Sequence, residues 1–315
     1  MVREAGGRGE GEGVLAIRFD VDSIRCIEDG IPRLRRLANS HDVRFTFFVN
    51  MGRSFNWWLT GRHVLRRLTG GGSPRRPPSD VGSAGASAVT PLSLPATKKL
   101  GPWAVVRTMA LNPMLGDRYR STFDALHEEG HELGLHGGTD HVVWQRALDT
   151  LSDEELDALL RPALATFRDR YGDPTGFASP GFRFDHRVKT ILDREGFVYA
   201  SDMSGEHPFR PAGPAPDTTS AAAPEYEHYE VPVNVIGEGN VPVIEQGLAR
   251  GLSDDAIVER AVGEITSRPF ALMYGHPYVE GVRADLLERI LEAVLPRYEV
   301  VTVAEYLSRW KAAEA

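Results

Sequence analysis

The chain has almost no cysteine, no long apolar run and no excess of positive charge, and each absence narrows what it can be. Cys26 is the only cysteine in 315 residues, which excludes a disulfide framework within the chain and is typical of a reducing compartment. The most apolar long stretch, 100–115, is short for a membrane span and contains Arg107. With a net charge of −8, the chain lacks the overall basic field that attracts nucleic acid.

The amino-terminal residues also lack the apolar core of a secretory signal. The first thirteen, MVREAGGRGEGEG, are rich in glycine and charge, and we expect them to form a flexible tail. We therefore expect a cytoplasmic protein that can touch the inner face of the cytoplasmic membrane without crossing it.

Short apolar runs alternate with amphipathic segments along most of the chain. The apolar runs are rich in β-branched and aromatic residues and predict strands, whereas the amphipathic segments predict helices. Strands are expected at 14–19, 43–49, 132–135, 177–179, 197–200, 229–235, 269–274 and 299–303, and helices at 28–39, 119–129, 152–171, 185–195, 253–266, 284–295 and 304–310. This order predicts an α/β fold, a distorted (β/α)7-type barrel, with an open doubly wound sheet as the alternative.

Two segments interrupt this alternation. Residues 51–115 form an expected insertion, whose middle part, 70–99, consists largely of Gly, Ser, Pro and Ala and predicts a mobile connector. Residues 211–224 have a similar composition and predict a second mobile loop. The rest of 14–315 is expected to form a single barrel domain.

Charged and imidazole side chains follow several predicted strands, where the working residues of parallel α/β folds lie. Asp20 and Asp22 end the first strand, and the side-chain period of two places both carboxylates on one side. Two carboxylates held together repel each other unless a cation or a proton lies between them. Arg183 and His276 follow two further strands. The alternative interpretations are that Asp20 and Asp22 lie in a solvated turn, that Arg183 is a surface arginine and that His276 is a structural histidine.

His136 and His141 follow the third predicted strand. Residues five apart lie about 140° apart around a helix, so these imidazoles can share an ion only from a loop. Gly137 and Gly138 would allow such a loop to fold tightly. Two imidazoles and a carboxylate make a three-ligand set with open positions, typical of catalytic zinc or non-haem iron sites. Asp140 is a rival third ligand, and separate duties for the two histidines are the alternative.

In this order, these residues resemble the polysaccharide deacetylase (NodB-homology, carbohydrate esterase family 4) superfamily. Four of its motifs have counterparts here, at 18–22 (RFDVD), 136–141 (HGGTDH), 179–183 (SPGFR) and 274–277 (YGHP). The similarity is closer to the ArnD-like branch, whose signatures resemble the runs at 50–53, 132–136, 143–145, 199–202, 208–211 and 279–281. Enzymes of that branch remove an N-formyl or N-acetyl group from an amino sugar carried on undecaprenyl phosphate.

The resemblance implies a role for each candidate residue. One divalent ion, Zn²⁺ foremost, with Mn, Co or Ni suiting the same donors, would be held by Asp22, His136 and His141. Asp20 would be the general base, and Arg183 would orient it. His276 would be the general acid, and Asp202 would tune it.

Two departures from the family pattern bear on these roles. The histidine spacing is one residue longer than in the family, which leaves Asp140 as a rival to His141. The tryptophan that follows the aspartate of the fourth motif is absent, which argues against a groove for a conventional polymer. The resemblance thus implies metal-dependent hydrolysis of the amide of a lipid-linked amino sugar. The alternatives are a deacetylase of a soluble saccharide or antibiotic intermediate, and an inactive barrel that binds the lipid carrier.

The insertion combines tryptophan, arginine and leucine, a composition suited to a membrane interface. The residues predicted to contact the membrane or lipid carrier are Trp57, Trp58, Arg62, Arg66 and Arg67. An anionic surface would attract the arginines, and a lipid-linked substrate needs its head at the barrel mouth while its tail stays in the bilayer. A helical hairpin packed on the barrel is the alternative, because amphipathic helices usually serve a core.

Overall fold

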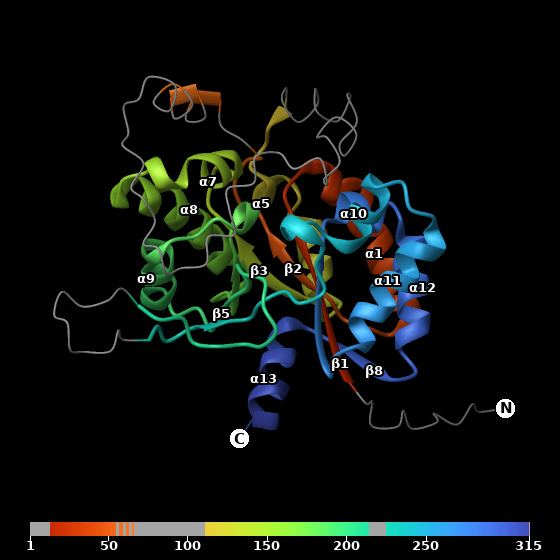
Figure 1. Ribbon diagram of the computed structural model, residues 1–315. Coiled ribbons are helices and arrows are strands. Elements are labelled where there is room, and N and C mark those ends of the chain that lie inside the picture. The colour runs from red at the N-terminus through yellow and green to blue at the C-terminus, as the bar shows by residue number, and fades with distance from the viewer. Residues whose placement is uncertain are drawn as a thin grey trace.

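A curled parallel sheet surrounded by helices forms the centre of the protein (Figure 1). The computed structural model describes residues 13–54, 57–58, 61–62, 65, 111–213 and 225–314. The strands are β1 (Gly13–Val21), β2 (Thr46–Val49), β3 (Glu132–His136), β4 (Gly176–Ala178), β5 (Tyr199–Ala200), β6 (Tyr229–Glu230), β7 (Phe270–Gly275) and β8 (Tyr298–Val301). The sheet order is β6-β5-β4-β3-β2-β1-β7, and β8 pairs with β1.

The helices follow the strands in the order expected of a (β/α) barrel. They are α1 (Ile31–His41), α5 (Leu115–Arg118), α6 (Arg120–Glu128), α7 (His141–Ala147), α8 (Asp153–Tyr171), α9 (His186–Arg194), α10 (Val243–Ala249), α11 (Asp254–Thr266), α12 (Ala284–Val294) and α13 (Val303–Glu314). Two π-helical turns, η1 (Cys26–Gly30) and η5 (Pro277–Gly281), come shortly after β1 and β7.

β1 is the central strand and has three parallel partners. Residues 14–19 pair with β7 along one edge. Residues 13–16 pair with β8 and residues 18–21 pair with β2, and because these registers do not overlap, the two strands share the second edge. Both edges and both faces of β1 are therefore covered. This burial explains the nearly continuous apolar sequence from which a buried strand was predicted.

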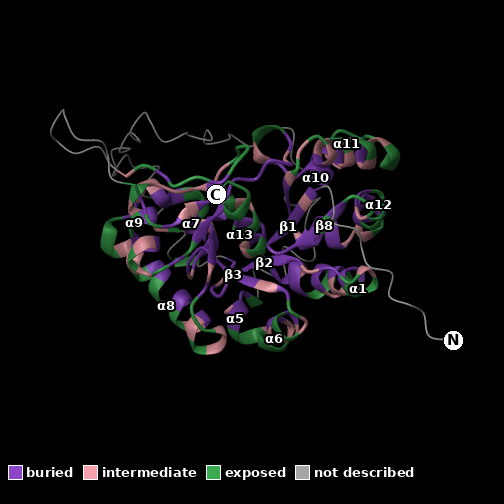
Figure 2. Ribbon diagram, turned by 90° about the horizontal axis from the view of Figure 1, so that it is seen from below, coloured by how far each residue is buried: buried purple, intermediate pink, exposed green. Residues whose placement is uncertain are grey.

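Side chains of β1 alternate between the two faces of the sheet. Leu15 and Phe19 point outward and join the large hydrophobic cluster that includes the surrounding helices. Ala16 points inward and joins a smaller cluster that also contains Tyr306 and Leu307 of α13. α13 therefore closes the amino-terminal end of the barrel, as the view from below shows (Figure 2). The opposite end, at the carboxyl ends of the strands, remains for polar residues.

The sheet closes on itself through one short seam. Val235, after β6, forms an isolated parallel bridge with Met273 of β7, and its N–H donates to the Leu272 carbonyl at 3.0 Å. The Asn234 side chain extends this seam, since Oδ1 accepts from the Leu272 N–H at 2.7 Å and Nδ2 donates to the Phe270 carbonyl at 3.0 Å. The predicted distorted barrel is therefore confirmed, and the open doubly wound sheet is excluded.

Most predicted elements are present, with ends shifted by a few residues. α8 begins with a capping box, in which the Ser152 hydroxyl accepts from the Glu155 N–H at 3.2 Å and the Glu155 carboxylate accepts from the Ser152 N–H at 3.1 Å. The helix predicted at 28–39 is divided between η1 and α1. α7 and α10 were not predicted, because each is only seven residues long.

Several sequence predictions lie outside the described residues. These are most of the tail (1–12), the connector at 70–99, Arg66, Arg67 and residues 214–224. Gly13, predicted to belong to the tail, belongs to β1, and Ala212, predicted to belong to the second loop, forms an isolated bridge with Glu225. Among the described residues, no helix has both the length and the apolar character needed to cross a bilayer.

His131, directly before β3, is buried as a neutral base. Its Nδ1 accepts a hydrogen bond from the Phe45 N–H at 3.1 Å, and its ring packs against Phe45 and Phe47. Burial lowers the pKa of His131 to about 4. The unfolded chain binds this proton below about pH 6.5, and the folded protein binds it only below about pH 4. The contribution of neutral His131 to the free energy of unfolding is therefore fully present above pH 6.5 and is lost as the pH falls toward 4.

We expect protonation of His131 to lower the free energy of unfolding by about 2 kcal/mol between pH 7 and pH 5. His131→Gln keeps an acceptor for the Phe45 N–H but cannot take up a proton, so it should remove this part of the pH dependence. Urea unfolding of both proteins at the two pH values measures the difference. Equal pH dependence in the variant and the wild type would contradict the prediction.

Candidate metal and catalytic site

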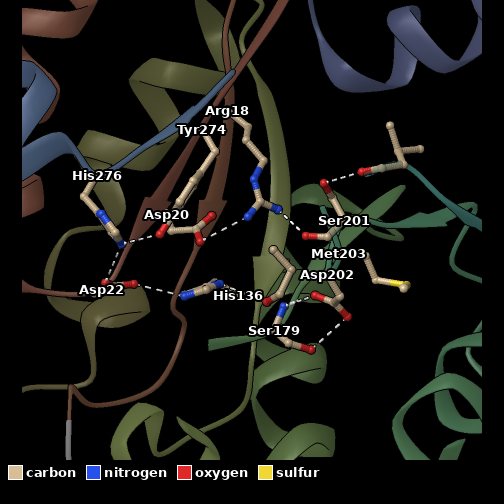
Figure 3. A network of polar contacts seen from close by, with 12 residues as sticks. Arg18, Asp20, Asp22, His136, Ser179, Ser201, Asp202, Met203, Tyr274 and His276 are labelled. Atoms are coloured by element: carbon tan, nitrogen blue, oxygen red, sulfur yellow. Dashed lines mark hydrogen bonds and ion pairs between the residues drawn. The ribbon is translucent and has the colours of Figure 1, made fainter. Parts of the chain in front are cut away.

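Acidic and imidazole side chains meet at the carboxyl ends of β1, β3 and β7 (Figure 3). Asp20 lies near the end of β1, and Asp22 directly follows the strand. His136 is the last residue of β3, His141 is the first residue of α7, and His276 follows β7. Because the sheet order is β3-β2-β1-β7, these strand ends share one rim of the barrel. The expected convergence of strand ends is observed.

Asp22, His136 and His141 bring three candidate ligand atoms within 4.8 Å of one another. Asp22 Oδ1 lies 3.0 Å from His136 Nε2 and 3.2 Å from His141 Nε2. His136 Nδ1 lies 2.9 Å from the Ala178 carbonyl oxygen, so this nitrogen carries the proton and Nε2 presents its lone pair. Gly137, with a φ of 63°, allows the chain to turn sharply after β3 toward His141.

The electrostatics of these side chains fit a divalent cation. Burial alone would lower the pKa of His136, but Asp20 and Asp22 outweigh it and raise that pKa above its ordinary value. Burial alone would raise the pKa of Asp22, but three neighbouring histidines bring it well below its usual range. Asp22 Oδ1 and His141 Nε2 are buried and have no hydrogen-bond partner among the described residues. A carboxylate oxygen and two imidazole nitrogens are donors that Zn²⁺ and similar ions accept.

His276 lies beside this ligand set. Its Nε2 is 3.5 Å from Asp22 Oδ2 and 3.4 Å from the Tyr274 hydroxyl (Figure 3). Its Nδ1 is 3.6 Å from Glu245 Oε2 on α10, and the Tyr278 ring stacks on the imidazole with 5.0 Å between centroids. Nε2 is therefore the nitrogen that faces the candidate metal ligands.

Known proteins share this arrangement of elements. No protein-family model matches the chain. The chain is 27% identical over 230 residues to the 4-deoxy-4-formamido-L-arabinose-phosphoundecaprenol deformylase ArnD assigned in Shewanella sediminis, covering 72% of this chain and 67% of that protein. A Mycobacterium smegmatis protein assigned as a polysaccharide deacetylase has a similar structure, with a TM-score of 0.58 at 14% identity over 98% of this chain and 93% of that chain.

The chain is therefore similar in sequence to an ArnD deformylase and in fold to a polysaccharide deacetylase. The resemblance predicted from the sequence motifs is thereby confirmed. The structure of Puue allantoinase is also similar, with a TM-score of 0.59 at 12% identity over 97% of this chain and 92% of that chain. Structural likeness at such low identity shows the fold alone, so the substrate must be argued from the site.

The longer histidine spacing relative to the superfamily pattern is accommodated by a strand, a turn and a helix. The prediction that both imidazoles come from one loop is wrong. His136 ends β3, and His141 begins α7. Asp140 caps α7, and its Oδ1 accepts a hydrogen bond from the Val143 N–H at 2.9 Å. His141 directs Nε2 toward Asp22. The geometry therefore favours His141 over Asp140 as the third ligand.

The arginine beside Asp20 is Arg18 and not Arg183. Arg18 Nη2 lies 3.4 Å from Asp20 Oδ2, and Arg18 Nη1 donates to the Ser201 carbonyl (Figure 3). Arg183 instead lies 3.3 Å from Asp149 Oδ1. The predicted orientation of Asp20 by Arg183 does not match the geometry, because β1 itself supplies the guanidinium on the same face as the carboxylate.

Three aromatic rings enclose the buried Arg18 guanidinium. The ring centroids of Phe48, Phe182 and Tyr274 lie 5.2, 5.2 and 5.0 Å from Arg18 Cζ. Cation–π attraction offsets part of the desolvation cost of this charge, and the rings leave the side chain little freedom to move. Arg18 is therefore a rigid neighbour for the Asp20 carboxylate.

Asp202 does not face His276, so its predicted tuning role is also corrected. Its carboxylate accepts hydrogen bonds from the Ser179 N–H and, at 2.9 Å, from the Ser179 hydroxyl (Figure 3). Burial and the nearby charge of Glu230 raise the pKa of Asp202 to about 7. Asp202 thus links the ends of β4 and β5, which contain only three and two residues and share few main-chain hydrogen bonds.

Sequence reasoning missed three residues that contact the candidate base and acid: Arg18, Glu245 and Glu280. Arg18 had a signal, since a charged residue two positions before Asp20 in an apolar strand shares its face. Glu280 Oε2 accepts a hydrogen bond from the His276 N–H at 2.6 Å, and its run was noted only as a branch signature. Glu245 had no signal, because α10 was not predicted.

Proposed function

We propose that the chain is a metal-dependent hydrolase that removes an N-formyl or N-acetyl group from an amino sugar carried on a polyprenyl phosphate. The relatives support the coarser part, hydrolysis of a carbon–nitrogen bond other than a peptide bond. The observation that carries the proposal is the Asp22–His136–His141 set with Asp20 and His276 beside it at one barrel rim. An inactive carrier-binding barrel would have no need to keep all five side chains together.

Each residue has a distinct task in this reaction, in which water adds to the amide carbonyl and the carbon–nitrogen bond breaks. When bound by the three ligands, the ion supplies a Lewis acid that polarises the carbonyl and lowers the pKa of water. Asp20, held by Arg18, accepts a proton from the attacking water. His276 gives a proton from Nε2 to the departing amine, which is a poor leaving group without it.

The direct test is release of free amine from defined substrates by protein loaded with Zn²⁺, Mn²⁺, Co²⁺ or Ni²⁺. The panel should contain the N-formyl and N-acetyl forms of an amino sugar on undecaprenyl phosphate, and the same sugars without lipid. Turnover of the lipid-linked forms, lost together with bound metal in His136→Ala, is the expected result. Turnover of only the lipid-free sugars would favour a soluble saccharide as the substrate, and no turnover by metal-loaded protein would reject the enzyme.

The segment after β2 supports a membrane-proximal substrate. Ser54 Oγ donates to the Asp22 carbonyl at 3.1 Å, so this segment starts beside the candidate metal ligands. Trp57 and Trp58 then expose 57% and 70% of their surface, and Arg62 lies over the Trp58 ring and 2.9 Å from Glu155 Oε1. Exposed tryptophan next to arginine suits the headgroup region of a bilayer. We therefore place the protein on the inner face of the cytoplasmic membrane.

Vesicle co-sedimentation tests this placement. Wild-type protein should sediment with anionic vesicles, less so at high salt because charge attraction is screened, and the fraction bound should fall in Trp57→Ala/Trp58→Ala. Phe209→Ala is the matched control, since this aromatic side chain is also 40% exposed but lies in a cavity beside α13 at the other end of the barrel. Equal sedimentation of both variants would remove the tryptophans from the membrane contact.

A further inference from the structure

His141 occupies the first position of α7, where a main-chain N–H group has no acceptor inside the helix. The Asp140 carboxylate caps the helix by accepting from the Val143 N–H, one turn further along. An acceptor that fixes the main chain of His141 must therefore come from another segment. Since His141 is a candidate metal ligand, the place of that acceptor bears on the geometry of the site.

The Arg53 carbonyl is this acceptor. It accepts from the His141 N–H at 3.3 Å, while the Arg53 N–H donates to the Thr139 carbonyl at 3.0 Å. The two bonds flank Asp140 and form an isolated parallel bridge between Arg53 and Asp140. The parallel pairing of β2 with β3 thus resumes once, beyond the ends of both strands. The position of His141 depends on where the Arg53 carbonyl lies.

Asn50, directly after β2, holds the Arg53 carbonyl from inside the turn at 50–53. Its Nδ2 donates to this carbonyl at 3.3 Å, and its Oδ1 accepts from the Gly52 N–H at 2.8 Å. The exposed surface of Asn50 is 0%. A buried amide with both ends bonded to the main chain has one favourable orientation, because any other leaves a buried polar group unpaired. The sequence run at 50–53 was noted only as a branch signature, and this contact gives it a structural task.

The surrounding chain leaves the turn at 50–53 little room to move. A Cβ on Gly52 would lie 2.3 Å from the Thr139 Cα, so the turn packs directly on the main chain before α7. On its other side, the Gly52 carbonyl accepts from the Leu115 N–H at 2.8 Å, and the Arg53 guanidinium donates to the Asn112 carbonyl. The turn is therefore a fixed support, and Asn50 is the side chain that closes it.

We propose that Asn50 is a positioning residue of the candidate metal site, which holds His141 Nε2 toward Asp22 through the Arg53 carbonyl. The inference rests on the proposed function only in taking Asp22, His136 and His141 as metal ligands. The longer histidine spacing gives such a support its purpose, because the second imidazole belongs to a helix and not to the turn that follows β3. Asn50 acts through the main chain and does not itself bind the ion.

Asn50→Ala is the central variant, and the affinity for Zn²⁺ in competition with a chelating dye is the measurement. We expect this affinity to fall about 10- to 100-fold, the usual effect of removing a group that orients a metal ligand. The measurement needs no substrate, so it does not depend on turnover. Wild-type Zn²⁺ affinity in the folded variant would overturn the proposal.

Asn234→Ala is the matched control. Asn234 is 8% exposed and also bonds the main chain with both ends of its amide, to the Leu272 N–H and the Phe270 carbonyl at the barrel seam. Its replacement removes the same kind of contact from another part of the sheet, so Zn²⁺ affinity should stay within about twofold of wild type. Equal losses of affinity in the two variants would overturn the proposal, because they would show a general effect of loosening the barrel.

A double-mutant cycle tests whether Asn50 acts through His141. In the His141→Ala background, Asn50→Ala should lower the residual Zn²⁺ affinity by less than about twofold, although it lowers the affinity of the wild type much more. A full further loss in this background would show that Asn50 acts on another ligand, and it would overturn the proposal.

Hydrogen exchange in metal-free protein keeps the proposal testable even if the wild type binds no Zn²⁺, a result that would reject the proposed function. Asn50→Ala, or Asn50→Asp if the alanine variant does not fold, should speed exchange of the His141 amide about 5- to 10-fold. The Val143 amide, which donates to Asp140 instead, is the internal reference and should change less. An unchanged rate at His141 would reject the role of Asn50.

Discussion

Asp20→Asn should bind as much metal as the wild type and lose about 10²- to 10⁴-fold in kcat, the usual contribution of a general base. Asp20 is 3% exposed and is not one of the three clustered ligand residues. Its Oδ2 faces Arg18, and its Oδ1 is buried with no hydrogen-bond partner within the described part of the chain. An amide has nearly the same shape but cannot accept the proton of water.

Asp22→Asn is the matched comparison, since it makes the same chemical change two residues further along the chain, directly after β1. Asp22 supplies an oxygen to the candidate ligand set, so this variant should lose metal together with activity. Metal content by elemental analysis and kcat with an N-acyl amino sugar separate the two variants. If Asp20→Asn loses the metal, or keeps wild-type kcat with the metal bound, Asp20 is not the base.

Adding a methyl group at Gly30 should both destabilise the protein and disturb His276. η1 and η5 pack against each other so closely that a Cβ on Gly30 would lie 2.0 Å from the Pro277 carbonyl oxygen, and a Cβ on Gly281 would lie 2.6 Å from the Gly30 Cα. These obstacles are main-chain atoms, which cannot rotate away as a side chain can. Overpacking of this kind costs about 1–3 kcal/mol.

The catalytic effect follows from where the two turns begin. η1 comes shortly after Asp22, and η5 directly follows His276, so separating the turns moves the candidate acid relative to the ligands. A displacement of about 1 Å can cost about 10²-fold in rate. We therefore expect Gly30→Ala to lower kcat about 10²-fold, with the free energy of unfolding measured in urea and kcat measured on the folded fraction.

Gly263→Ala provides the control for this glycine effect. Gly263 lies inside α11 with no atom within 4 Å of its would-be Cβ, so alanine should stabilise the helix by up to about 1 kcal/mol. Its kcat should stay at the wild-type value. A Gly30→Ala protein as stable and active as Gly263→Ala would show that the two turns can separate freely.

Strand ends were predictable from the sequence, and this is why the candidate ligands were found. Short apolar runs mark β1, β3 and β7, and the rule that parallel strands present their carboxyl ends together places Asp22, His136 and His276 on one rim. The two-residue period also places Arg18 and Asp20 on one face, although that consequence was not drawn. These inferences need only local sequence and the direction of the strands.

The partners of the base and the acid could not be read in this way, because they depend on packing between distant segments. Arg183 lies near the rim, but Asp149 is close enough to pair with it. Glu245 comes from a seven-residue helix whose apolar pattern is too short to identify, and it meets a histidine 31 positions later in the chain. The family resemblance predicted that an arginine would contact the base and a carboxylate would contact the acid. Which residues fill these positions depends on the packing of the fold.

The short seam at Val235 is also the place where the barrel should open locally most easily. Its few hydrogen bonds, two of them made by the Asn234 side chain, should open at a lower free energy than the six-residue register of β1 and β7, so the Val235 amide should exchange with solvent first. The candidate ligands and catalytic groups belong to the continuous stretch from β3 to β7. The side of the barrel at the Val235 seam can therefore move apart around a bulky ligand, while the distances among the candidate ligands and catalytic groups stay fixed.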